Sequence, residues 1–285
     1  MDKRRKGLVA LLLAALCLLS LGGGLAEAGK SPYTPVRLYI DGYLTGRAYS
    51  NNGQIYLSAQ DVCAYLGLDA EIICETPQGK VTMMAPGLEL TIEREQRYVA
   101  VNGRYLYNPM DILYVNNKVY VPMDVLAAVF NLIIYLPGEE NRVDLDVSQA
   151  QILTGGPNYY DEVYGEDNVF WLSKIISAEA YNQSMAGKIA VGNVVLNRVA
   201  HPKFPDTIFD VIFDTNNGIQ FEPVLNKSIY LEPSVPSRIA ACLCLEGYNT
   251  AGDSIFFVAP SLADDTWFRE HRTYVVTIGT HVFYK

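Results

Sequence analysis

The sequence has 285 residues and a formal net charge of −9 at pH 7. Its length leaves room for two domains of ordinary size, each with its own hydrophobic core. The negative charge argues against nucleic acid as a partner, because phosphate binding requires a positive surface.

The N-terminal segment predicts a secretory signal peptide over residues 1–28. Residues 3–6 are all basic, residues 8–21 are almost wholly apolar, and Ala26-Glu27-Ala28 supplies the small residues of a cleavage site. We expect cleavage after Ala28 and export from the cytoplasm. Retention as a membrane anchor is the alternative, since the apolar run lies near the lower limit of roughly 18 residues for a spanning helix. Cleavage removes four basic and two acidic side chains, which changes the net charge from −9 to −11.

Residues 36–147 are typical of short strands with one buried face. Leu88, Leu90 and Ile92 alternate with polar residues, and residues 143–147 show the same alternation. This pattern predicts half-buried antiparallel strands in a β-rich domain over residues 35–148.

An internal repeat lies within this domain. Residues 51–68 and residues 116–132 both have the pattern of a turn, a strand and a short helix. Ser58 and Asp61 form a capping-box sequence, and Pro122 suits the first helical position of the second copy.

The two repeat helices also have matching ends, because Gly67 and Asn131 are residues that tolerate the left-handed conformation of a helix stop. A duplicated strand–helix unit of this kind resembles the copper amine oxidase N-terminal-like domain, a stalk module of exported bacterial proteins. No copper chemistry is expected, because this half lacks a cluster of His or Cys ligands. Tyr39, Tyr56 and Tyr98, with Tyr120, alternate as strand residues do. We expect a spacer or a wall-association module.

Residues 149–168 predict a linker, because Gly155-Gly156-Pro157 breaks regular structure and charged residues follow. The second domain is expected over residues 169–285.

The cysteines outside the leader predict buried thiols rather than a disulfide framework. Cys242 and Cys244 lie two apart on a predicted helix, and a Cys63–Cys74 bridge is the alternative for the other pair. The three histidines are too scattered for a metal site, so no metal and no cofactor is expected.

A carboxylate lies on the apolar stripe of the first helix of the second domain, predicted over residues 170–180. Leu172, Ile175 and Ile176 occupy positions i, i+3 and i+4, and Glu179 occupies i+7. A carboxyl group on a buried face either pairs with a cation, here Arg198, or keeps its proton through a raised pKa. A proton held near neutral pH is what a general acid requires.

Several ordered motifs of the second domain resemble the spore cortex-lytic, cell wall hydrolase family. They lie at Trp171–Ala180, Gly187–Val199, His201–Pro205, Val211–Phe213, Gly218–Phe221, Leu231–Pro233 and Ile278–Tyr284.

The resemblance implies a lysozyme-like, mainly α-helical catalytic domain with a small β-sheet, and hence an α+β chain. It implies cleavage of peptidoglycan glycan strands between N-acetylmuramic acid and N-acetylglucosamine, with Glu179 as general acid and then base. The implied reaction is lytic transglycosylation, which leaves a 1,6-anhydro ring and needs one carboxylate. Ordinary glycosidases need two, about 5 to 10 Å apart. Asp214, Glu222 and Glu232 are candidates for the second, although Glu232 also suits a capping role beside Pro233.

Substrate contacts are predicted for one amide and several rings. Gln220 is expected to bind an acetamido group, and the rings are expected to cover sugar faces, with a place in the core as the alternative. The expected rings are those of Phe221, Tyr230, Phe257 and Trp267.

Other polar residues are expected to be structural. Asn193, Asn197 and Arg198 should join helices by buried hydrogen bonds, and His281 should pack near the C-terminus.

One residue departs from the family pattern. Ala259 precedes Pro260 where the family commonly has asparagine, which favours a wall-binding protein without turnover as one alternative. A peptidoglycan amidase is another, although neither zinc-ligand spacing nor a Cys/His pair supports it. The stalk-like module makes vegetative wall remodelling as reasonable a role as spore cortex lysis.

Overall fold

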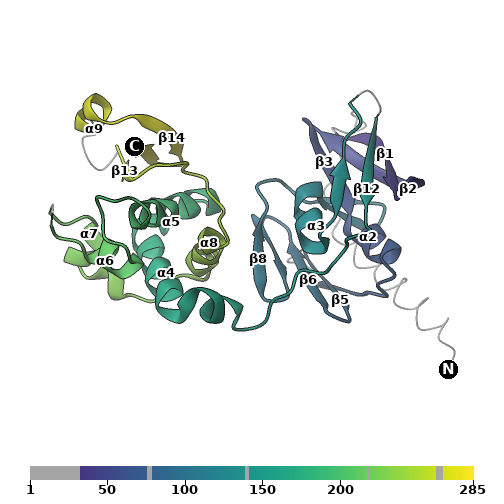
Figure 1. Ribbon diagram of the computed structural model, residues 1–285, viewed down its shortest axis with the longest axis horizontal. Coiled ribbons are helices and arrows are strands. Elements are labelled where there is room, and N and C mark those ends of the chain that lie inside the picture. Colours follow the sequence, from purple (N-terminus) through teal and green to yellow (C-terminus); the bar gives the residue numbers. More distant parts are fainter. Residues whose placement is uncertain (1–32, 76–78, 139–140, 217, 261–265) are drawn as a thin grey trace. The chain divides into compact units, whose positions relative to one another are not determined.

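The computed structural model describes residues 33–75, 79–138, 141–216, 218–260 and 266–285. The chain divides into two compact units, Met1–Pro157 and Asn158–Lys285 (Figure 1). The predicted signal peptide lies outside the described residues. Within the described ranges, no helix has both the length and the apolar character needed to span a bilayer.

The described residues of the first unit form two β-sheets and two short helices. One sheet has seven strands in the order β11-β12-β1-β2-β3-β10-β9, and the other is a meander of five, β4 to β8. The elements are β1 (Thr34–Ile40), β2 (Tyr43–Asn51), β3 (Gln54–Ser58), α2 (Ala59–Tyr65), β4 (Glu71–Glu75), β5 (Lys80–Ala85), β6 (Leu88–Glu93), β7 (Tyr98–Val101), β8 (Arg104–Tyr107), β9 (Leu113–Val115), β10 (Lys118–Pro122), α3 (Met123–Phe130), β11 (Ile133–Tyr135) and β12 (Arg142–Asp146).

The predicted alternation is confirmed in β6 and β12. Leu88, Leu90 and Ile92 are buried while Glu89 between them is exposed. The expected strand direction is wrong at one place, because β12 pairs antiparallel with β11 but parallel with β1. A two-residue alternation identifies a buried face and carries no information on the direction of the neighbouring strand.

The internal repeat is confirmed as β3–α2 and β10–α3, and its two strands pair antiparallel. The Ser58 hydroxyl accepts a hydrogen bond from the Asp61 amide, 3.1 Å, so the predicted cap forms. The reciprocal half of the capping box does not, because the Asp61 carboxylate pairs with Lys118. Pro122 is the N-cap of α3 and not its first helical residue.

Both helix stops have the left-handed conformation that the sequence predicts. Asn131 is the C-cap of α3 with φ 51°, and Gly67 follows α2 with φ 72°. Residues without a β-carbon, or with a short polar side chain, adopt this conformation at the lowest cost.

Residues 150–157, here called the strap, are bound to the first unit. The amides of Gln151 and Leu153 donate to the last carbonyls of α3, at 2.9 and 2.8 Å, and the Asn102 side chain donates to the Leu153 carbonyl at 2.8 Å. A β-carbon on Gly155 would lie 2.2 Å from the Asn102 carbonyl oxygen, so only glycine allows this approach. The first part of the predicted linker is therefore ordered on the first unit.

The second unit is mainly helical with one small sheet of order β13-β15-β14. Its first helix begins at Glu166, inside the segment predicted as linker, and a π-helical turn precedes it. The α+β class is thus confirmed. The elements are η1 (Asp161–Gly165), α4 (Glu166–Ala180), α5 (Met185–Val199), α6 (Ile208–Phe213), α7 (Glu222–Leu225), η2 (Ser228–Tyr230), α8 (Val235–Leu245), β13 (Phe256–Val258), α9 (Thr266–His271), β14 (Tyr274–Ile278) and β15 (His281–Tyr284).

A glycine allows α4, α5 and α8 to pack closely. A β-carbon on Gly192 of α5 would lie 2.6 Å from Cys244 Sγ on α8 and 2.8 Å from Ile176 Cδ1 on α4. Both neighbours are buried, so neither side chain has free space to move into.

We expect Gly192→Ala to lower the free energy of unfolding by about 1–3 kcal/mol, the usual cost of overpacking a core. Thermal and urea unfolding of the full chain measures this loss. Cys244→Ala in the same chain should restore part of it, because it removes the closer atom. Gly46→Ala is the control, since nothing lies within 4 Å of the position that its β-carbon would take. Equal effects of the two glycine variants would contradict the packing argument.

The four cysteines of the described residues are all thiols. Cys242 and Cys244 are buried on α8, as predicted, and the alternative Cys63–Cys74 bridge is not formed. Burial raises the pKa of the Cys63 thiol to about 12, so this thiol is unreactive at neutral pH.

Candidate active site

Glu179 lies in the last turn of α4, at the end of the apolar stripe. Leu172, Ile175 and Ile176 are fully buried, whereas Glu179 is half-buried. The carboxyl group thus lies where the buried face of α4 meets solvent. This position lets it remain reachable while losing much of its hydration.

The pKa of Glu179 is raised from its ordinary value of 4.5 to about 7. Burial is the largest cause, and the negative charge of Glu222 adds to it. The positive charge of Arg198 opposes both. Glu179 therefore holds its proton near neutral pH, as the sequence predicts for a general acid.

Lys188 of α5 fixes the backbone that follows Glu179. Its buried ammonium donates to the carbonyl oxygens of Ala180 and Tyr181, at 2.5 and 2.6 Å. A cation on the final carbonyls of a helix satisfies orphan acceptors and complements the helix dipole. This residue was not predicted from the sequence, although a lysine on the apolar face of a predicted helix was a usable signal.

The turn between β14 and β15 is joined to the segment just after α4. The Gln183 side chain donates to Thr280 Oγ1 at 2.8 Å, and the Thr280 amide donates back to Gln183 at 3.4 Å. A β-carbon on Gly279 would lie 2.3 Å from Gln183 Oε1. The last motif of the chain therefore helps to hold the backbone near Glu179.

Arg198 is buried among aromatic rings rather than paired with Glu179. Its guanidinium lies over the rings of Phe204 and Phe221, at 5.1 and 5.0 Å, and its Nε donates to the Ile255 carbonyl at 2.8 Å. Among the ion pairs of the described residues, none joins Arg198 and Glu179. The two residues interact at longer range, so the alternative of a simple salt bridge is not what the structure shows.

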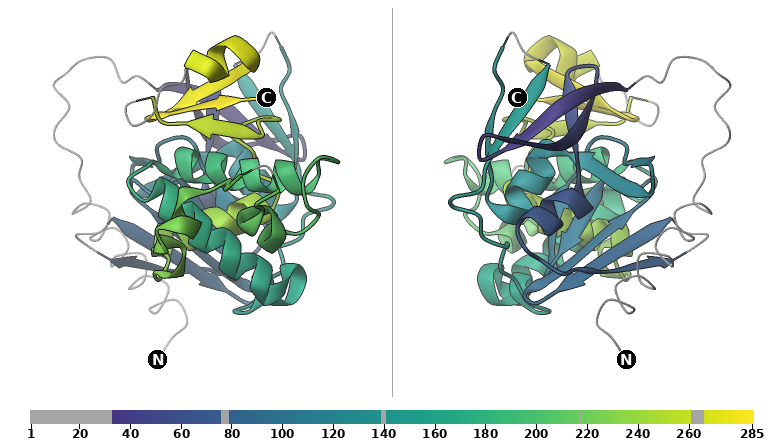
Figure 2. Two further views of the ribbon diagram at one scale, coloured as in Figure 1. Left: turned by 90° about the vertical axis from the view of Figure 1, so that its left-hand side faces the viewer. Right: turned by 90° about the vertical axis from the view of Figure 1, so that its right-hand side faces the viewer.

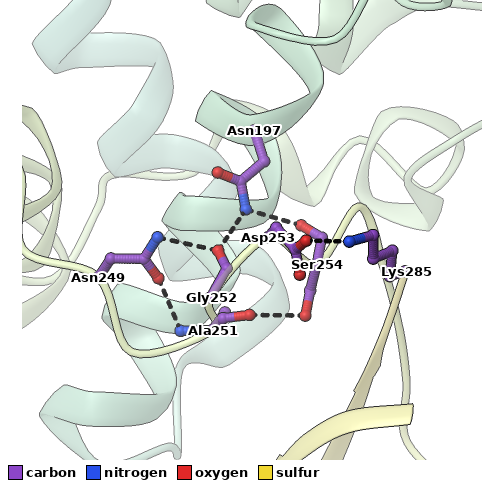
Figure 3. Close-up of polar contacts among 7 residues, drawn as sticks. All are labelled: Asn197, Asn249, Ala251, Gly252, Asp253, Ser254 and Lys285. Atoms are coloured by element: carbon purple, nitrogen blue, oxygen red, sulfur yellow. Dashed lines mark hydrogen bonds and ion pairs between the residues drawn. The ribbon is translucent and has the colours of Figure 1, made fainter. Parts of the chain in front are cut away.

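Two asparagines of α5 hold the segment after α8, and Figure 3 shows the contacts of one of them, Asn197. Asn197 donates to the carbonyls of Gly252 and Ser254, at 2.8 and 2.9 Å. Asn193 donates to the Tyr248 carbonyl at 2.9 Å and accepts from the Thr250 amide at 2.9 Å. The predicted hydrogen bonds are present, but they bind the loop that leads to β13 instead of another helix.

The three candidate second carboxylates have different surroundings. Glu222 is exposed at the start of α7 and acts electrostatically on Glu179. Asp214 is buried and accepts from the Asn216 amide at 2.9 Å. Glu232 is exposed and lies 3.5 Å from Lys174 Nζ. The expected capping role of Glu232 is wrong, because Ser234 is the N-cap of α8.

The aromatic rings that were predicted to contact the substrate differ in exposure. Tyr230 is 59% exposed and can offer a face to a ligand, whereas Trp267 is 51% exposed but its ring stacks on His271 and lies under Arg272. Phe257 is half-buried, with its ring centroid 5.4 Å from that of His281. Phe221 is only 2% exposed, so the expectation that it lies in a groove is corrected to a place under Arg198.

Three further residues that the sequence analysis singled out also lie in the second unit. Gln220 is half-buried and its amide donates to the Gly218 carbonyl at 3.0 Å. His281 is buried near the C-terminus, as predicted, and burial lowers its pKa. Ala259 follows β13 and is half-buried. Within the part of the chain that the structure describes, no three His, Cys, Asp or Glu side chains gather as a metal site.

Two family models match the chain, one in each unit. Residues 182–284 match the Cell Wall Hydrolase family, and residues 40–145 match the Copper amine oxidase N-terminal domain. Both resemblances seen in the sequence are thereby confirmed: the chain contains a cell wall hydrolase domain after a copper amine oxidase N-terminal-like domain. The first match begins just after Glu179.

Curated relatives match a similar share of the chain. A spore cortex-lytic enzyme of Oceanobacillus iheyensis is 30% identical over 122 residues, which are 43% of this chain and 43% of that protein. The spore cortex-lytic enzyme of Bacillus subtilis is 26% identical over 120 residues, 42% of this chain and 38% of that protein. The matches thus span less than half of these relatives.

Among solved structures, the catalytic domain of the germination-specific lytic transglycosylase SleB from Bacillus anthracis is 28% identical. The alignment covers 43% of this chain and 98% of that domain, with a TM-score of 0.40.

Proposed function

We propose that this chain is an exported peptidoglycan-degrading enzyme whose second unit cleaves glycan strands by lytic transglycosylation, with Glu179 as acid and base. The observation that carries the proposal is the half-buried Glu179 carboxyl group, whose pKa of about 7 leaves it protonated near neutral pH. The cell wall hydrolase domain that begins beside this residue supports peptidoglycan as the substrate.

In the first step, protonated Glu179 donates its proton to the glycosidic oxygen between N-acetylmuramic acid and N-acetylglucosamine. The C1–O bond breaks, the leaving sugar departs with its new hydroxyl group, and positive charge develops at C1. The Glu179 carboxylate that remains is stabilised by Arg198, whose charge lowers the pKa of Glu179. In this partly desolvated position the carboxylate interacts more strongly with a positive charge at C1 than it would in water.

In the second step, the same carboxylate accepts the proton of the muramoyl C6 hydroxyl group. The C6 oxygen forms a bond to C1 and closes the 1,6-anhydro ring, and Glu179 is again protonated. No water is consumed, so the reaction needs no second carboxylate in the protein. Lys188 and the Gln183–Thr280 contacts keep the end of α4 in place through both steps.

Hydrolysis is the second candidate function, and one observation favours it. The negative charge of Glu222 raises the pKa of Glu179, so a second carboxylate lies within electrostatic range. Two such carboxylates are the apparatus of an ordinary glycosidase, in which one activates water or attacks C1.

Digestion of purified peptidoglycan tests both candidates. The full chain is incubated with peptidoglycan, and the soluble fragments are analysed by mass spectrometry. Anhydro-muramoyl ends, lighter by one water than reducing ends, would support transglycosylation. Reducing ends would establish hydrolysis and assign Glu222 as the next residue to vary. Binding without release of fragments would support a wall-binding protein that has lost turnover.

We also propose that the first unit is a spacer that associates with the wall, of spore cortex or of vegetative cells. The test compares cosedimentation of the full chain with insoluble cortex and with vegetative peptidoglycan, using the Glu179→Gln variant so that the polymer stays intact.

A further inference from the structure

A pocket of about 460 Å³ lies beside α9, on the small sheet of the second unit. Helix α9 packs against this small sheet (Figure 2). The Phe268 ring of α9 lies 6.2 Å from that of Phe256 on β13 and 5.7 Å from that of Tyr284 on β15. The pocket is lined by Arg269, Arg272, Tyr274, Thr277, Val282 and Tyr284.

Arg272 is held in this pocket by aromatic rings. Its guanidinium carbon lies 4.5 Å from the centre of the Phe256 ring and 5.1 Å from that of Trp267. The Trp267 ring in turn stacks on His271, with centroids 5.0 Å apart and planes at 15°. Stacking of this kind fixes the plane of a guanidinium and leaves its N–H edge available.

The donors of Arg272 are not used within the described part of the chain. No side-chain hydrogen bond or ion pair of Arg272 occurs among the described residues, whereas other surface cations such as Lys285 are paired. A second guanidinium, that of Arg269, lines the same pocket, and Tyr274 and Thr277 add hydroxyl groups that lie 3.2 Å from one another.

We propose that this pocket binds a carboxylate group of the peptide stems that peptidoglycan glycan strands carry. The unpaired N–H groups of Arg272 can form two parallel charge-assisted hydrogen bonds with the two oxygens of a carboxylate, and Arg269 adds positive charge to the same pocket. The local positive charge stands out in a chain of net charge −9. The proposal rests on the proposed function, since it takes peptidoglycan as the polymer, and it adds the peptide as a second recognised part.

Direct titration tests this site without any turnover. A soluble stem peptide with free carboxylates is titrated into the full chain by calorimetry, and the fluorescence of Trp267 is followed in a Trp171→Phe background, since the chain has two tryptophans. We expect binding by the parent chain and a loss of affinity of about tenfold or more in Arg272→Gln, the scale of a charge-assisted hydrogen bond. Arg238→Gln on α8 is the matched control, because it removes the same charge from an exposed surface pair.

One more variant and a modified peptide test whether binding depends on a guanidinium and on a carboxylate. Arg272→Lys keeps the charge but not the planar fork, so it should also bind weakly. A peptide with amidated carboxylates should not bind to the parent chain, which tests the site without a substitution. Equal binding of free and amidated peptide, equal loss in Arg238→Gln, or competition by inorganic phosphate but not by acetate would overturn the proposal.

The outcome is separable from that of the proposed function. Failure of the chain to digest peptidoglycan, with stem-peptide binding that depends on Arg272, would refute the proposed reaction and keep the site. Digestion of peptidoglycan without stem-peptide binding would support the proposed reaction and refute the peptide-binding site.

Discussion

Glu179→Gln is expected to lower the rate of fragment release from peptidoglycan by a factor of about 10² to 10⁴, the usual contribution of a general acid. Glutamine keeps the shape of the side chain but can neither give a proton to the glycosidic oxygen nor take one from the C6 hydroxyl group. Initial rates of release from purified peptidoglycan measure the loss. Binding to the polymer should be retained, because the variant removes only one proton carrier.

Unfolding measurements supply the control for this variant. The pKa of Glu179 is about 7 in the folded chain and 4.5 in its ordinary state, so the folded chain holds this proton more tightly. The contribution of this group to stability is therefore complete below about pH 4.5 and is lost as the pH rises towards 7. Glu179→Gln should unfold at a higher temperature than the parent chain above pH 7, because it has no charge to desolvate. An inactive variant with a lowered melting temperature would point to misfolding, and retained activity would refute the role of Glu179.

Glu222→Gln is expected to move the alkaline limb of the kcat/KM profile to lower pH. The reaction needs protonated Glu179, so kcat/KM should fall in the parent chain as the pH rises through about 7. Glu222 is a like charge that raises this pKa, and its removal lets Glu179 ionise at lower pH. The activity at pH 7 and above should fall while the activity well below pH 6 stays close to that of the parent.

The matched control for this profile is Glu232→Gln. Glu232 is also an exposed carboxylate, but it pairs with Lys174 and is not among the charges that shift the pKa of Glu179. Its profile should overlay that of the parent chain. A Glu222→Gln variant that loses activity equally at every pH would instead indicate that Glu222 takes part in the chemistry, as hydrolysis requires.

The sequence predicted those features that a local pattern encodes. The repeat in the first unit was visible because turn, strand and helix recur with the same end residues, and Gly67 and Asn131 adopt the left-handed conformation in both copies. The position of Glu179 followed from a helical stripe of three apolar residues. Features that depend on the partner element were not visible, such as the parallel pairing of β1 with β12.

The errors in the predicted site have the same origin. Phe221 lies beside Gln220 in one of the family motifs, yet tertiary packing places its ring under Arg198. The sequence marks Lys188 only as a lysine on an apolar helix face, because its role depends on carbonyl groups at the end of another helix. Glu232 lies beside a helix start, but the chain turns so that Ser234 is the cap.

The strap has a consequence for how this module can be exchanged between proteins. Its hydrogen bonds to the end of α3 and to Asn102 make residues 150–157 a structural part of the first unit. A genetic fusion or a recombination event that joins a new domain after residue 148 would expose the last carbonyls of α3, which Gln151 and Leu153 now satisfy. A joint after Pro157 would carry the whole strap with the module. The segment that must be transferred as one module therefore extends beyond the last β-strand, as far as residue 157. A chimera joined after residue 157 should be obtained as a folded protein more readily than one joined after residue 148.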